Sequence, residues 1–141
     1  MTILAAVDRS DRSEYVVREA AALADAFGSD LHVLHVLSVG EFVDLERTSV
    51  KSTNEVLDMD EVRNVAANIA AEAAKELDRD HDSVGLVGDA EDEIVRYAEE
   101  LDAEYIVMSP RKRSPTGKAL FGSVAQSVII SASCPVVTVR E

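Results

Sequence analysis

Short runs of apolar, mostly β-branched residues alternate with longer segments of helical periodicity along this 141-residue chain. The short runs predict buried strands, and the longer segments predict amphipathic helices. We expect strands at residues 3–7, 31–37, 84–87, 105–108 and 136–139, and helices near 10–27, 62–77, 91–102 and 123–131. Such alternation is typical of a parallel sheet covered by helices on both faces. The expected fold class is therefore α/β, with a single domain over residues 1–141.

Local signals predict how several segments begin and end. Ser10 and Asp11 are expected to cap the first helix, and Gly28 stands where its C-terminal cap belongs. Residues 38–58 carry mixed charges without clear periodicity, which predicts an irregular surface insertion. Residues 109–122 are expected to form a polar loop.

The charge of the chain excludes several classes of partner. Its 27 acidic and 14 basic residues give a net charge of −13, which repels nucleic acid and anionic membranes. Lysine occurs only four times, and an acidic, lysine-poor surface favours a halophilic source, where salt screens the repulsion.

Cys134 is the one cysteine and is expected to be a small buried side chain. We expect a cytoplasmic protein without disulfides.

The stretch from 109 to 122 is the most informative for function. It holds Arg111, Lys112, Arg113 and Lys118 and no acidic residue, and it ends in Gly122-Ser123 at the start of a helix. Helix N-termini present free N–H groups and partial positive charge, so this stretch is a candidate phosphate site. The alternative is a solvated basic loop that pairs with acidic neighbours or a second subunit. The spacing of its glycines does not match a P-loop.

Other polar residues carry weaker signals. Asp8 follows the first strand, where ligands of doubly wound sheets bind, and it is either a ligand contact or a turn-forming acid. His32 and His35 are three apart in a strand, so they face opposite sides of the sheet and cannot share a metal. No metal site is expected, and no general base stands beside the basic loop.

Five short motifs resemble the universal stress protein family over nearly the whole chain. They are Val7-Asp8-Arg9-Ser10, Gly88-Asp89-Ala90, Ile106-Val107-Met108, Gly122-Ser123-Val124 and Cys134-Pro135-Val136-Val137. The resemblance implies a Rossmann-like sheet of the adenine nucleotide alpha-hydrolase type, with strand order 3-2-1-4-5. It also implies a homodimer paired through the edge of strand five, where Val136, Val137 and Val139 would otherwise form an exposed apolar edge.

The nucleotide-binding branch of the family carries Gly, two residues, Gly, nine residues, then Gly and Ser or Thr. In this chain the first two positions are Ser109 and Lys112, whereas Gly122-Ser123 match. By resemblance, Asp8 and Val36 lie near adenine and ribose, and Gly122, Ser123 and Val124 meet phosphates. We infer that this loop differs from the family loop and binds an anion through its Arg and Lys side chains rather than through its backbone. The candidate nucleotide-binding set is Asp8, Val36, Met108, Ser109, Arg111, Lys112, Gly122, Ser123 and Val124.

Three functions follow from these patterns. The first is a regulatory or stress-response module that binds ATP or a related adenylate. The second is a dimeric interaction module of the same fold that binds no nucleotide, which the two missing glycines favour. The third, an enzyme such as a slow ATPase, is the least favoured.

Overall fold

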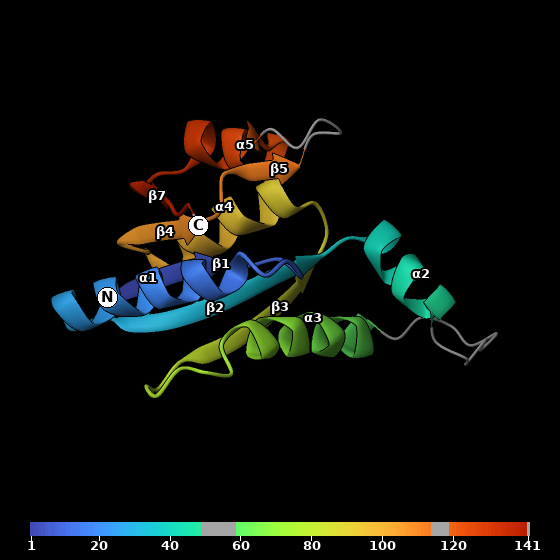
Figure 1. The fold of residues 1–141 in the computed structure, drawn as a ribbon, viewed down its shortest axis with the longest axis horizontal. Helices are drawn as coiled ribbons and strands as arrows, with labels where there is room; N and C mark the ends of the chain where they lie inside the picture. Colours follow the sequence, from blue (N-terminus) through green and yellow to red (C-terminus); the bar gives the residue numbers. More distant parts are fainter. Residues whose placement is uncertain (49–58, 114–118, 141) are drawn as a thin grey trace.

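The computed structural model describes residues 1–48, 59–113 and 119–140 of the chain. The elements follow one another in the order β1 (Thr2–Ala6), α1 (Ser13–Phe27), β2 (Asp30–Leu37), α2 (Val39–Thr48), α3 (Met59–Ala73), β3 (Asp82–Val87), α4 (Ala90–Leu101), β4 (Tyr105–Met108), β5 (Arg111–Arg113), β6 (Ala119–Phe121), α5 (Ser123–Ser131) and β7 (Val136–Thr138) (Figure 1). The predicted strands and helices are present with small shifts of their ends.

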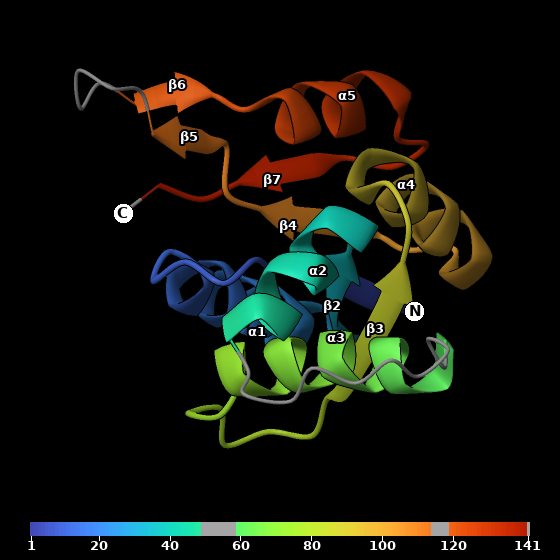
Figure 2. The ribbon, with the colours of Figure 1, turned by 90° about the vertical axis from the view of Figure 1, so that its right-hand side faces the viewer.

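Five strands form one parallel sheet in the order β3-β2-β1-β4-β7. Because β7 is the fifth strand of this sheet along the chain, the expected order 3-2-1-4-5 is confirmed. The order reverses between β1 and β4, which is where ligands bind in folds of this class. The helices lie on both faces, with α1 and α3 on one side and α4 and α5 on the other (Figure 2).

Alternate residues of each strand supply two separate cores. From β1, Ile3 and Ala5 pack with α1 and α3, whereas Leu4 packs with α4 and α5. All three side chains are fully buried. This period of two explains why the strands read as continuous apolar runs, since both faces of the sheet are covered.

Two segments differ from the sequence expectations. Residues 39–48 of the expected irregular insertion form α2, which rests on the buried side chain of Phe42. Residues 111–113 and 119–121 of the expected loop form an antiparallel hairpin. The remaining parts of both stretches, 49–58 and 114–118, lie outside the described residues.

Gly28, the start of α1 and Cys134 also bear on the sequence expectations. Gly28 caps α1 with a left-handed φ of 63°, as predicted. The prediction that Ser10 and Asp11 cap that helix was wrong, because the N-cap is Arg12 and residues 8–11 form a turn. Cys134 is half-buried against the α4–α5 core rather than fully buried.

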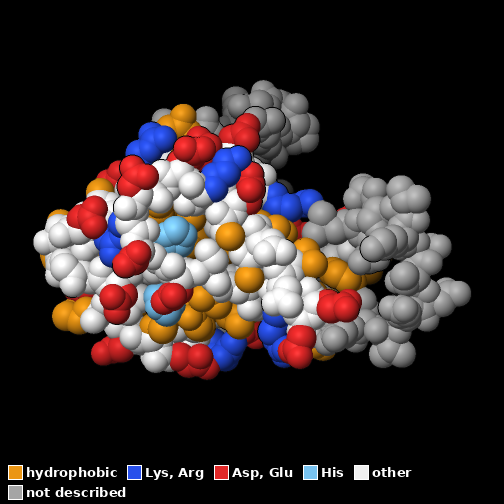
Figure 3. All heavy atoms as spheres, turned by 90° about the horizontal axis from the view of Figure 1, so that it is seen from below, with side chains coloured by type: hydrophobic (Ala, Val, Ile, Leu, Met, Phe, Trp, Pro, Cys, Tyr) orange, Lys and Arg blue, Asp and Glu red, His pale blue; other side chains and the backbone are white. Residues whose placement is uncertain are grey.

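The surface reflects the acidic composition. Acidic side chains are spread over the face seen from below Figure 1, with basic side chains scattered among them (Figure 3). Within the described parts of the chain, none of the helices has the length and apolar character that crossing a bilayer requires.

Candidate functional site

A cavity of about 570 Å³ lies at the carboxyl ends of β1, β2 and β4, beside the N-terminus of α5. This is the switch point of the sheet, and the volume suits a ligand of nucleotide size. The wall combines apolar side chains such as Ile94 and Met108 with a few polar and charged groups from three loops.

The structure brings most of the sequence-predicted set to this cavity. Seven of its nine members line the wall, namely Asp8, Val36, Met108, Ser109, Gly122, Ser123 and Val124. Arg111 and Lys112 begin β5 in the hairpin that follows β4, and their side chains lie outside the described part of the structure.

Asp8 stands just beyond β1 and is held in one orientation. Its Oδ1 accepts hydrogen bonds from the Ser10 backbone N–H at 2.8 Å, the Ser10 hydroxyl and the Ser13 hydroxyl at 3.0 Å. Burial alone raises the pKa of Asp8, but these donors and the positive charge of Arg12 outweigh it, so the pKa lies below 3.8. Asp8 is therefore both a turn-forming acid and an ionised carboxylate at the cavity, with Oδ2 still available to a ligand.

The N-terminus of α5 supplies positive potential on another part of the wall. The Gly122 amide, expected to be free, instead donates to the Pro110 carbonyl at 2.8 Å. The amides of Ser123, Val124 and Ala125 open the helix and have no intrahelical carbonyl to bind. The first turn of α5 contains no acidic residue, whereas each of the other four helices has at least one. In so acidic a chain this leaves the helix dipole uncompensated at the cavity.

Arg12 also lines the cavity, and sequence reasoning missed it. Its side chain is only 15% exposed, and its buried Nε has no hydrogen-bond acceptor. Its Nη2 lies 3.9 Å from Asp8 Oδ2, which is an ion pair but not a hydrogen bond. A buried donor without an acceptor costs about 1–3 kcal/mol, more when charged. No pattern in the sequence marks this residue, because its isolation depends on the turn formed by residues 8–11.

His35 and Glu41 form a second group that the sequence did not reveal. The His35 ring lies between two acceptors, with Nδ1 2.7 Å from the Val7 carbonyl and Nε2 3.0 Å from Glu41 Oε1. The other Glu41 oxygen pairs with Arg9 Nε at 3.2 Å. Burial lowers the pKa of His35, but these two contacts and the charges of Glu41 and Asp8 outweigh it and raise the pKa above 6.5. A protonated His35 therefore fastens the first turn of α2 to the cavity wall.

This arrangement predicts pH-dependent stability. Because folding raises the pKa of His35, its contribution is complete below about pH 6.5 and is lost as the pH rises through the folded-state pKa. Glu41→Gln is expected to lower the free energy of unfolding by about 1.5–3 kcal/mol near pH 6. The difference from wild type should shrink as the pH rises through the folded-state pKa of His35, as measured by urea denaturation. A difference that stayed constant would show that His35 does not titrate against Glu41.

His32 has different partners from His35, near the opposite ends of the strands. Its Nδ1 lies 2.9 Å from the Tyr97 hydroxyl and its Nε2 3.1 Å from Asp82 Oδ2. Across the described ranges, histidine, cysteine and acidic side chains form no group of three or more that would suit a metal ion.

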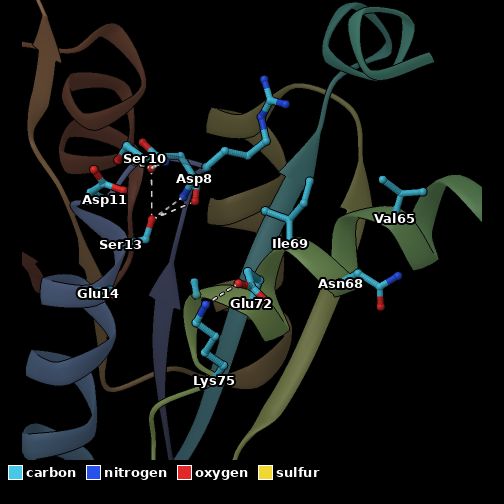
Figure 4. A pocket seen from close by; sticks show the side chains of 12 residues that line it. Asp8, Ser10, Asp11, Ser13, Glu14, Val65, Asn68, Ile69, Glu72 and Lys75 are labelled. Carbon is cyan, nitrogen blue, oxygen red and sulfur yellow. Dashed lines mark hydrogen bonds and ion pairs between the residues drawn. The ribbon is translucent and has the colours of Figure 1, made fainter. Parts of the chain in front are cut away.

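A second cavity, of about 520 Å³, lies between α3 and the turn after β1 (Figure 4). Val65 and Ile69 give it an apolar side, and its rim carries Asp11, Glu14 and Glu72. The Lys75 ammonium in this rim is already paired with Glu72 at 2.6 Å. This excess of acids disfavours a phosphate, so the cavity at the switch point is the better anion site.

The fold and the switch-point cavity define a Rossmann-like α/β protein with a cavity beyond the carboxyl ends of its parallel strands. The chain belongs to the universal stress protein family, whose family model matches residues 1–140.

Individual relatives agree with this assignment. Universal stress protein MJ0531 of Methanocaldococcus jannaschii is 29% identical over 139 residues, which cover 99% of this chain and 81% of that protein. A universal stress protein structure from Archaeoglobus fulgidus is similar with a TM-score of 0.70 and 36% identity, over 99% of this chain and 98% of that one. A universal stress protein from the same organism in complex with dAMP gives a TM-score of 0.62 and 28% identity at the same coverage.

Proposed function

We propose that this protein is a stress-response or regulatory module that binds ATP or a related adenine nucleotide in the switch-point cavity. The observation that carries the proposal is the charge arrangement of one nucleotide-sized cavity. The acid-free N-terminus of α5 and the unsatisfied Arg12 attract phosphate, while the ionised Asp8 accepts hydrogen bonds from hydroxyl or amino groups. The Archaeoglobus fulgidus relative in complex with dAMP supports the same ligand class.

The direction of the ligand follows from these charges. Phosphates are attracted by the first amides of α5 and by Arg12, and repelled by the carboxylates of Asp8 and Glu41. They are therefore proposed to lie beside Ser123 and Val124, where an Arg12 side chain turned away from Asp8 would reach them. The ribose and base then lie toward Asp8 and Val36. The hairpin that carries Arg111 and Lys112 begins two residues after Ser109, so its basic side chains are proposed to replace contacts that glycines make in the nucleotide-binding branch.

A second function is a dimeric interaction module without a nucleotide. Its support is the edge position of β7, together with the exposed side chains of Ile129 and Ile130 on neighbouring α5. An unpaired edge strand with apolar neighbours favours pairing with a second copy of the chain. We propose the β7 edge as the homodimer interface in either case, and a single domain over residues 1–141. A cytoplasmic, high-salt setting fits the net charge of −13.

Calorimetry with ATP, ADP and AMP at high salt tests nucleotide binding. We expect saturable heat with each nucleotide, because all three carry a phosphate and the same adenosine. Light scattering on the same sample measures the mass in solution. Absence of heat with every nucleotide, together with a mass of two chains, would reject the first function in favour of the second.

A further inference from the structure

Arg12 occupies an unusual position for an arginine. It stands at the N-cap of α1 without a side-chain capping bond, and it lines the cavity with a side chain that is 15% exposed. The positive end of a helix dipole is an unfavourable place for a cation. The Arg12 side chain does not stabilise α1, so the helix itself does not explain why an arginine stands here.

A comparison with Arg79 shows how incomplete the environment of Arg12 is. The Arg79 side chain is 24% exposed and donates hydrogen bonds to an Asp25 carboxylate oxygen at 2.6 Å and to two backbone carbonyls. Arg12 is more deeply buried, and within the described residues its one charged contact is the 3.9 Å pair with Asp8. Its Nε is sealed from solvent without an acceptor. The guanidinium therefore lacks the acceptors that a buried arginine normally has.

The neighbouring carboxylate does not supply them. Asp8 Oδ1 already accepts from Ser10 and Ser13, which fixes the side chain, and Oδ2 stays beyond hydrogen-bond distance of Arg12. Arg12 lines the cavity, so a ligand there can supply acceptors to the guanidinium once the side chain turns. A guanidinium binds phosphate oxygens through two parallel N–H groups, and it repels a cationic ligand.

We propose that Arg12 is a phosphate-binding residue of the nucleotide site. This inference rests on the proposed function and extends it, since it assigns the anion contact to a residue of α1 rather than to the hairpin or α5 alone. Because no hydrogen bond among the described residues holds the guanidinium, it can turn toward a ligand by side-chain rotation. The empty site leaves a buried donor unsatisfied, and phosphate binding satisfies it.

The inference predicts that one variant loses nucleotide affinity without losing stability. Arg12→Met keeps an unbranched apolar stem at this position and removes the guanidinium with its unsatisfied donor. We expect its melting temperature without ligand to equal or exceed that of the wild type, whereas its affinity for ATP and AMP falls at least tenfold. Arg12→Lys, which keeps the charge, should recover part of that loss. Adenosine, which has no phosphate, should bind to Arg12→Met with the same dissociation constant as to the wild type.

Arg18→Met is the matched control. Arg18 is an exposed arginine on α1 whose guanidinium stacks over Tyr15, and the substitution removes the same charge from the same helix. We expect its ATP affinity to stay within threefold of wild type.

Three results for Arg12→Met would overturn the inference: an unchanged affinity for ATP, an equal loss of affinity for adenosine and for AMP, or a clear drop in melting temperature. If the wild type binds no nucleotide, both the proposed function and the role of Arg12 fail. If the wild type binds and Arg12→Met binds equally well, only the role of Arg12 fails.

Discussion

Gly85→Ala is expected to destabilise the protein more than any other single methyl group added to a described glycine. Gly85 lies in β3 beneath α3, and a Cβ built there would stand 2.2 Å from the Arg63 carbonyl oxygen and 2.3 Å from the Ala67 amide nitrogen. Both contacts are with backbone, so no side-chain rotation relieves them. The helix must move off the sheet and give up packing of the buried Ala66 and Ala70.

We expect a loss of about 3 kcal/mol or more in the free energy of unfolding, at the upper end for overpacked cores. The melting temperature of a chain of this size should fall by roughly 10 °C. Thermal and urea unfolding followed by circular dichroism measure both quantities.

Gly40→Ala is the matched control, because it adds the same methyl group with the opposite expectation. A Cβ at Gly40, in α2, meets nothing nearer than Ser38 Oγ at 4.0 Å. Replacing a helical glycine in open space should stabilise the protein by about 0.5–1 kcal/mol. If both variants changed stability by similar amounts, α3 and β3 would not be in close backbone contact.

Gly85 also shows what the sequence can and cannot predict about this fold. The five strands and the covering helices follow from period and alternation, because the central strands β1, β2 and β4 are buried on both faces. The order of the strands followed from the family resemblance instead. A glycine inside a strand pattern signals a close backbone approach. The alanines that α3 turns toward the sheet also indicate a close backbone approach. Neither pattern alone predicts that α3 and β3 are the two elements in contact.

The two missed elements lack a signal of their own. Phe42 is the one side chain that α2 buries among those described, and the helix is fastened by the contacts of Glu41 with His35 and Arg9. The β5–β6 hairpin begins with three consecutive basic residues, which show no alternation. Tertiary contacts decide both elements, so local propensity could not predict them.

Only part of the candidate site could be predicted from the sequence. Asp8 and Ser123 follow from strand ends and a helix start, which are local features. Arg12, His35 and Glu41 belong to the cavity because a turn, a strand and a helix converge there. Their roles depend on distances and missing partners, which periodicity and spacing do not encode.

Ser123→Glu is expected to abolish tight ATP binding while leaving the fold intact. Ser123 is the exposed first residue of α5 and lines the cavity. A carboxylate in the first turn stabilises a helix by about 0.3–1 kcal/mol, so the variant should be slightly more stable than the wild type. The same charge repels a bound phosphate by about 1 kcal/mol at 4 Å in bulk water and about 4 kcal/mol at an effective dielectric constant of 20. Affinity should therefore fall by at least about fivefold, and by far more where the site excludes water.

Two controls separate the local charge from size and from net charge. Ser123→Gln adds a neutral side chain of the same length, and Gln126→Glu adds the same charge one turn further along α5, outside the described cavity lining. Calorimetry with ATP should show a far smaller loss for both than for Ser123→Glu. An equal loss in Ser123→Gln would mean steric exclusion, and an equal loss in Gln126→Glu would mean long-range repulsion. Full affinity in Ser123→Glu would show that α5 does not bind the phosphate, because a carboxylate at this position would repel a phosphate bound to the first amides of the helix.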